Sequence, residues 1–209
     1  MALHQTFLFH KGALYPHYHL CQYLPRAAGR DELSRSLLNF KTSVPEDIRA
    51  WVDRALALLP SDLLSPGICV VRALHHQETI AGVGAHSPLD QLGAALATYF
   101  NGLYLPQLLR KSRPARKINQ LPTAEREEEL KDIYYICMDS RGHSGGDQPG
   151  SGQLGSDPFG SEPSGAFLVI DDILTTGATA RSIIDALVGA LPDYRITLFT
   201  LAKASPIGN

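Results

Sequence analysis

The sequence predicts an α/β protein in which a mostly parallel sheet is flanked by helices and joined by a small N-terminal cap. Two observations carry this prediction. Short β-branched segments alternate with helix-forming segments between residues 67 and 201, and these strand segments are continuously apolar, as in strands buried on both faces. The length agrees, because a single core in a chain of 209 residues can bury roughly 70% of the unfolded surface. We place the cap at residues 1–60 and the core domain at residues 61–209.

The composition excludes several classes of protein. Apolar residues make up 44% of the chain and charged residues 19%, which is a globular composition. The 19 Lys and Arg residues against 21 Asp and Glu residues give a net charge of -2, which argues against attachment to nucleic acid or membrane mainly by charge. No apolar run reaches the ~18 residues needed to span a bilayer, and the first residues do not resemble a signal peptide. Three widely spaced cysteines predict no disulfide framework, so we expect a cytoplasmic protein.

The cap begins with two strands and ends with a helix. Gln5–His10 and His17–Leu24 alternate between apolar and polar residues in the manner of strands. The helix predicted for Pro45–Leu59 opens with proline and two acidic residues, which suit the first turn and its positive dipole.

The core domain then alternates strands with helices. A helix begins at Ser87 and Pro88, because serine caps a helix and proline fits its first position. The predicted strands are Ile68–Leu74, Ile133–Cys137, Ala166–Asp171 and Arg195–Leu201, and the other helices are Ala124–Lys131 and Thr179–Leu191.

Residues 139–165 interrupt this alternation. They hold eight of the 18 glycines together with six serines and three prolines. Such a composition cannot offset the entropy lost on ordering, so we predict a flexible insertion on the surface.

The segment Phe167–Thr179 combines features that suit a phosphorylated ligand. Four apolar residues form a strand that ends in Asp171 and Asp172, and a loop of small residues then opens directly into a helix. Ligands of open α/β sheets bind at the carboxyl ends of strands. Free backbone N–H groups at a helix start attract a phosphate, and Gly177 permits close approach of the backbone. Carboxylates accept hydrogen bonds from hydroxyls or bind a divalent metal, so a ribose 5-phosphate fits.

This segment, DDILTTGAT at Asp171–Thr179, resembles the 5-phosphoribosyl-1-pyrophosphate (PRPP) motif of type I phosphoribosyltransferases. Leu108–Arg113, Asn119–Leu121 and Arg126 are similar to the loop region of the ComF-like, competence-associated branch, and Leu37–Lys41 to the segment before its first core helix. The likeness covers residues 37–201 and is strongest at residues 167–180.

The resemblance implies a role for each matching position. The acidic pair would bind the ribose hydroxyls and act in catalysis together with Lys111 and Arg113, which belong to a mobile loop at Arg110–Arg126 that closes over the site. The 5′-phosphate would be cradled by Thr175, Thr176, Gly177, Ala178 and Thr179, and the pyrophosphate loop would be Ala73, Leu74, His75 and His76.

Two departures from the family pattern concern pyrophosphate and metal binding. The branch carries prolines and arginines in its pyrophosphate loop, whereas Arg72 is the one permanent cation here. The branch also tends to begin with a cysteine-rich metal-binding segment, where this chain has Cys21 alone.

The expected activity is transfer of the 5-phosphoribosyl group of PRPP, bound with Mg²⁺, to an unidentified acceptor of the nucleobase type, with release of pyrophosphate. Thr175 stands where enzymes for 6-oxopurines carry an acidic residue, which disfavours hypoxanthine and guanine. The alternative is a non-catalytic ComF-like regulator that binds a ribose-phosphate ligand and a macromolecular partner, such as DNA-processing machinery. The charge balance disfavours direct contact with nucleic acid, and a homodimer is compatible with either interpretation.

Three weaker signals stay open between functional and structural interpretations. His17, His19 and Cys21 would share one face of a strand, where a half-exposed face without metal is favoured over a zinc site that lacks a fourth ligand. His75 and His76 fit a pyrophosphate loop and a solvated loop equally well. The cations of Arg110–Lys117 fit a basic surface patch, a nucleic-acid contact or a lid, and their position favours the lid.

Overall fold

The computed structural model describes residues 1–24, 29, 31–64, 67–82, 87–117, 121–138 and 165–204. The predicted insertion lies outside the described residues except for Gly165, as do Asn119 and Gln120 of the predicted mobile loop.

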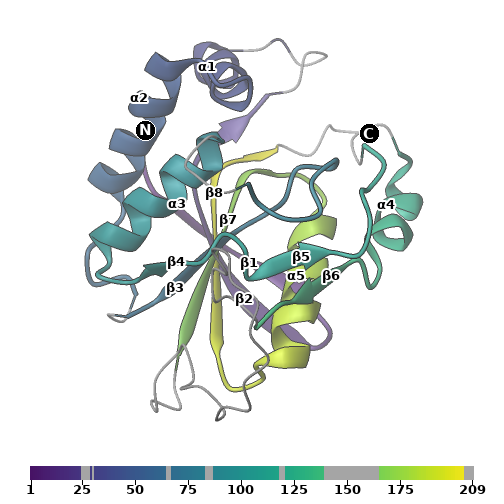
Figure 1. Ribbon diagram of the computed structural model, residues 1–209. Coiled ribbons are helices and arrows are strands. Elements are labelled where there is room, and N and C mark those ends of the chain that lie inside the picture. The colour runs from purple at the N-terminus through teal and green to yellow at the C-terminus, as the bar shows by residue number, and fades with distance from the viewer. Residues whose placement is uncertain are drawn as a thin grey trace, which may run out of the picture.

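A six-stranded sheet forms the centre of the molecule (Figure 1), and every neighbouring pair except β1 and β2 is parallel. This arrangement confirms the predicted α/β class with a mostly parallel sheet. In spatial order the strands are β1 (His4–His10), β2 (Ala13–Tyr23), β8 (Arg195–Ala204), β7 (Ala166–Leu174), β3 (Cys69–Arg72) and β4 (Leu103–Tyr104).

Helices cover both faces of this sheet. Figure 1 shows α1 (Glu32–Lys41), α2 (Pro45–Leu58) and α3 (Pro88–Tyr99) on one side, and α5 (Ala178–Ala190) on the other. Side chains of β7 alternate between the two layers, because Leu168 packs in the cluster of α1–α3 whereas Val169 packs against α5. Burial on both faces explains why the strand sequence is continuously apolar.

The start of α3 forms as its sequence predicts. The Ser87 side chain accepts a hydrogen bond from the Asp90 backbone N–H, and the Asp90 carboxylate accepts one from the Ser87 N–H. This capping box satisfies two backbone donors that the helix itself leaves free. It also fixes Asp90 beside the end of β3, where that carboxylate contacts Arg72.

The N-terminal segment extends the sheet. Its hairpin of β1 and β2 pairs with β8, so that His17 lies opposite Leu198 and Cys21 opposite Ala202. The boundary at residue 60 stays a prediction, and the sheet runs across it.

A small antiparallel ribbon stands apart from the main sheet. It consists of β5 (Leu109–Lys111) and β6 (Tyr134–Ile136), and α4 (Thr123–Leu130) lies between them in the chain. The prediction that Ile133–Cys137 forms a strand buried in the core sheet was therefore wrong. Tyr134 is buried but Tyr135 is 45% exposed, because one face of the ribbon meets the core and the other meets solvent. Among the described residues, no helix has the length and apolar character that crossing a membrane requires.

Candidate functional site

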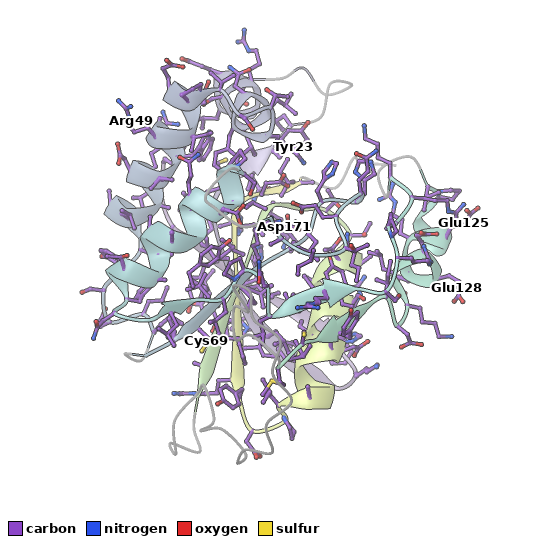
Figure 2. The ribbon with its side chains drawn as sticks, viewed as in Figure 1. Tyr23, Arg49, Cys69, Glu125, Glu128 and Asp171 are labelled. Atoms are coloured by element: carbon purple, nitrogen blue, oxygen red, sulfur yellow. The ribbon has the colours of Figure 1, made fainter. Side chains whose placement is uncertain are left out.

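The candidate site lies where the chain leaves two neighbouring strands toward opposite faces of the sheet. β3 pairs with β7, and the chain continues from β3 to α3 on one face and from β7 to α5 on the other. Such a switch point opens a crevice at the carboxyl ends of the strands. A cavity of about 480 Å³ is present there, and Figure 2 shows Asp171 near the middle of the molecule. The ends of β3 and β7, the end of α1 and the start of α3 supply the main lining residues, among them Phe40, Lys41, Arg72, His75, Glu78, Leu89, Asp90, Asp171 and Asp172.

Asp171 and Asp172 both lie within β7, which continues to Leu174, three residues past the predicted end. The Asp172 backbone N–H donates to Asp171 Oδ1 over 2.8 Å, and Lys41 Nζ lies 2.8 Å from Asp172 Oδ2. Burial and the neighbouring Asp172 charge raise the pKa of Asp171 to about 7. Burial by itself would lower the pKa of Lys41, but Asp172 outweighs it and raises that pKa. One cation thus faces two carboxylates.

The loop after Asp172 has the geometry of an open helix start. Gly177 adopts a φ of +81° at the N-cap position, directly before α5, and no side chain caps this helix. Asp171 and residues 173–180 line a small hollow of about 20 Å³ beside the larger cavity, and Asp171 belongs to both.

Gly177 is required for two reasons visible in the structure. A positive φ is strained for residues with a side chain. An added Cβ would also lie 2.9 Å from Leu8 Cδ1 and 3.2 Å from an Arg181 guanidinium nitrogen. A substitution at Gly177 would therefore disturb packing as well as any ligand.

The predicted pyrophosphate loop follows β3, and its cation is already paired. Arg72 is 2% exposed and contacts Asp90 Oδ1 at 2.5 Å and both Glu78 oxygens at 2.8 and 2.9 Å. Burial alone would lower the pKa of Arg72, but hydrogen bonds to Glu78 and Asp90 outweigh it and raise that pKa. Tyr104 donates a further hydrogen bond to Asp90 Oδ1 at 2.6 Å. Arg72 thus stabilises the loop from within.

His75 and His76 follow in this loop. Their ring centroids lie 4.0 Å apart, and His75 is exposed at the cavity while its backbone N–H donates to Glu78 Oε2 at 2.7 Å. Burial, followed by the charge of His75, lowers the pKa of His76.

Lys111 is buried, whereas the sequence favours a mobile lid for this stretch. It is 4% exposed, and Nζ donates to the carbonyl oxygens of Leu74 at 3.0 Å and His75 at 2.8 Å. Burial lowers the pKa of Lys111 to about 8. The sequence suggested a surface cation because its neighbours are charged, but β5 turns this side chain inward under the loop after β3.

Arg113 and Arg116 share one partner on α4. Arg113 Nη1 lies 2.7 Å from Glu129 Oε1, and Arg116 Nε lies 2.8 Å from Oε2. The hydrogen bond from Arg113, followed by those from Arg116, lowers the pKa of Glu129 to about 2. Neither arginine lines the cavity of about 480 Å³.

The His17, His19 and Cys21 face was predicted to be half-exposed, and that prediction was wrong. All three residues are buried, because β2 lies inside the sheet between β1 and β8. Hydrogen bonds of 2.9 Å join the His17 ring to Thr6 and Thr200. Burial is the largest cause that lowers the pKa of His17 to about 3 and that of His19 to about 4.

Asp171 and Asp172 are the residues of this site that could hold a magnesium ion. The part of the chain that the structure describes contains no group of three or more His, Cys, Asp or Glu side chains placed to hold a metal. Mg²⁺ is usually held by one or two carboxylates together with substrate phosphates and water. Asp171 and Asp172 supply two such carboxylates at the cavity.

Three residues that shape this site carry no functional signal in the sequence. Lys41 belongs only to a segment of family resemblance, whereas the structure places its ammonium on Asp172. Glu78 and Asp90 had no local signal, since their importance comes from contact with Arg72 across 6 and 18 positions of sequence.

Comparison of the chain with models of known protein families gives no match, and comparison with curated proteins gives none either.

Proposed function

We propose that this protein is a phosphoribosyltransferase of type I that transfers the 5-phosphoribosyl group of PRPP to an acceptor held in the cavity of about 480 Å³. The observation that carries the proposal is the placement of Asp171, which lines both this cavity and the small hollow of the Thr175–Thr179 loop. A ligand with a diol and a phosphate a few ångströms apart would use both.

In this proposal the chain binds and orients the two ends of the sugar. Backbone N–H groups of Thr175–Thr179 bind the 5′-phosphate, helped by the positive end of α5. Asp171 and Asp172 accept hydrogen bonds from the ribose hydroxyls. The bond from the anomeric carbon to pyrophosphate breaks, and its electron pair leaves with pyrophosphate. The acceptor lone pair forms a new bond to that carbon and the acceptor loses a proton to water, while the carboxylates stabilise positive charge that develops on the sugar.

Mg²⁺, when bound with PRPP, would be held by Asp171 and Asp172 and would neutralise charge on the departing pyrophosphate. Lys111 acts in this scheme by holding the Leu74 and His75 carbonyls, which places the loop that faces the pyrophosphate. Arg113 would have to leave Glu129 to contact that group.

The acceptor would bind between α1 and α3. Leu89 is partly exposed there and offers apolar surface, as a planar base requires, and Lys41 supplies a cation to the same cavity.

One observation favours a second function, a regulator that binds a ribose-phosphate ligand without catalysis. Arg72 forms ion pairs with Glu78 and Asp90, so the loop after β3 has no free guanidinium for pyrophosphate.

Turnover separates the two functions. The protein is incubated with PRPP, Mg²⁺ and a panel of nucleobases, and pyrophosphate release is measured for each. The transferase predicts release with at least one base, which is lost in Asp171→Asn. Binding of ribose 5-phosphate without release from any base would favour the regulator.

A further inference from the structure

We infer that Arg181 is a positioning residue that sets the orientation of the phosphate-binding loop; this inference rests on the proposed function. Arg181 lies in the first turn of α5 and is outside the segment that resembles the PRPP motif. Its Nη2 donates to the Thr176 carbonyl oxygen at 2.8 Å and to Glu127 Oε1 of α4 at 2.7 Å.

The contact with Thr176 fixes one peptide plane. A trans peptide is planar, so the carbonyl of one residue and the N–H of the next point in opposite directions, and no cis bond occurs among the described residues. Because the Thr176 carbonyl points to Arg181, the Gly177 N–H points away from it. That N–H belongs to the loop lining the small hollow, and it is one of the donors that the proposed function assigns to the phosphate.

Gly177 also leaves this peptide easy to rotate. Glycine tolerates a wide range of backbone angles, so the sequence of the loop does not by itself hold the donor in place. The guanidinium stands directly against Gly177, since a Cβ there would lie 3.2 Å from Nη1 and 3.7 Å from Cζ. Arg181 thus braces the most flexible residue of the loop from the side away from the proposed ligand.

Glu127 is the second partner of the guanidinium. The Arg181 side chain is 22% exposed and that of Glu127 is 65% exposed, so their ion pair is screened by solvent and contributes little to stability. We therefore expect the contact with the Thr176 carbonyl to matter more for binding than the pair with Glu127. Loss of the carboxylate alone should leave Arg181 in place.

Calorimetry with ribose 5-phosphate tests this inference in four proteins: wild type, Arg181→Met, Arg181→Lys and Glu127→Gln. The methionine should weaken binding about 10-fold, the effect of one misplaced hydrogen bond to a charged group. The lysine keeps a donor for the Thr176 carbonyl and should stay within about 3-fold of wild type, as should Glu127→Gln. The ³¹P chemical shift of the bound phosphate should change in Arg181→Met and should return to the wild-type value in Arg181→Lys. A purely structural role of Arg181 would not produce this pattern.

The outcomes separate the inference from the function on which it rests. Unchanged affinity in Arg181→Met overturns the inference alone, and so does equal impairment in Arg181→Lys and Arg181→Met. If Arg181→Met does not fold, Arg181→Gln takes its place, because the glutamine amide is too short to reach the Thr176 carbonyl. The affinity of Arg181→Gln is then compared with that of Arg181→Lys. A wild-type protein that fails to bind ribose 5-phosphate contradicts the proposed function itself.

Discussion

The loops after β3 and β7 lie side by side at one edge of the sheet, yet they are built in opposite ways. After β3, Arg72 is enclosed by Glu78 and Asp90, and the loop carbonyls of Leu74 and His75 are bound by Lys111. Near the end of β7, Asp171 and Asp172 share Lys41, and the helix that follows this strand has no side-chain cap. The charged and polar groups of the first loop have their partners within the protein, whereas the second loop leaves negative charge and backbone N–H donors for a ligand.

The difference shows that polar residues at a cavity do not all serve its ligand. Arg72 lines the same cavity as Asp171, but its guanidinium is committed to two carboxylates. A substitution after β3 should therefore act on folding, and one after β7 on binding. Four predictions test this division.

The largest effect is expected for Arg72→Met. It removes the cation from Asp90, which is 3% exposed, and from Glu78, so both carboxylates are left without their charged partner. Breaking a buried pair in this way should lower the free energy of unfolding by roughly 3–5 kcal/mol, as measured by urea denaturation. Asp172→Asn is the matched control after β7 and should change it by less than about 1 kcal/mol. A similar loss of unfolding free energy in the two variants would contradict this difference between the two loops.

A smaller effect, dependent on pH, is expected for Asp171→Asn. Burial and Asp172 raise the folded pKa of Asp171 from 3.8 to about 7, so the folded protein holds this proton more tightly than the unfolded chain between those values. Wild-type stability should then fall as pH rises from 4 to 7. The asparagine variant lacks this loss, so its stability should gain roughly 2–3 kcal/mol relative to wild type between pH 5 and 8. Thermal melts of both proteins at pH 5 and pH 8 measure this gain. A stability difference that is the same at both pH values would argue against the raised pKa of Asp171.

Lys111→Met should show the opposite dependence at alkaline pH. Burial lowers the folded pKa of Lys111 from 10.5 to about 8, so the unfolded chain binds this proton more tightly. The stability of the wild type should rise relative to the methionine variant between pH 8 and 10, by about 1 kcal/mol for each pH unit. Parallel stability curves for the two proteins would contradict the lowered pKa of Lys111.

The smallest effect is expected when Arg113 and Arg116 are both replaced by Gln. Their guanidinium groups are largely exposed, so loss of the Glu129 contacts should lower the free energy of unfolding less than Arg72→Met does. Affinity for ribose 5-phosphate should stay within about 3-fold of wild type, because neither residue lines the cavity. A loss of affinity larger than the loss of stability would place these arginines at the ligand.

The segment around β7 was predictable because its information is local. Four apolar residues, two aspartates and a loop of small residues specify a buried strand, an acidic end and a helix start without reference to other parts of the chain. The same reasoning located α3 from Ser87 and Pro88.

The rest of the site could not be read in this way because it depends on tertiary contacts. Lys41 reaches Asp172 from a helix 131 positions earlier in the chain, and Arg72 finds its partners only when α3 packs beside β3. β5 spans three residues within a basic stretch, so its strand character comes from pairing with β6. The burial of His17 likewise requires the strands on either side of it.

The binding of ribose 5-phosphate to wild type and to the Asp171→Asn, Asp172→Asn double variant tests the central claim most directly. The double variant is preferable to a Gly177 variant, because an added side chain at Gly177 would also disturb Leu8. Charge-assisted hydrogen bonds contribute about 1.5–3 kcal/mol each, so calorimetry should show binding to wild type that weakens at least about 100-fold in the folded double variant. Equal affinity in the two proteins, or no binding to either, would contradict the assignment of this loop as a ribose-phosphate site.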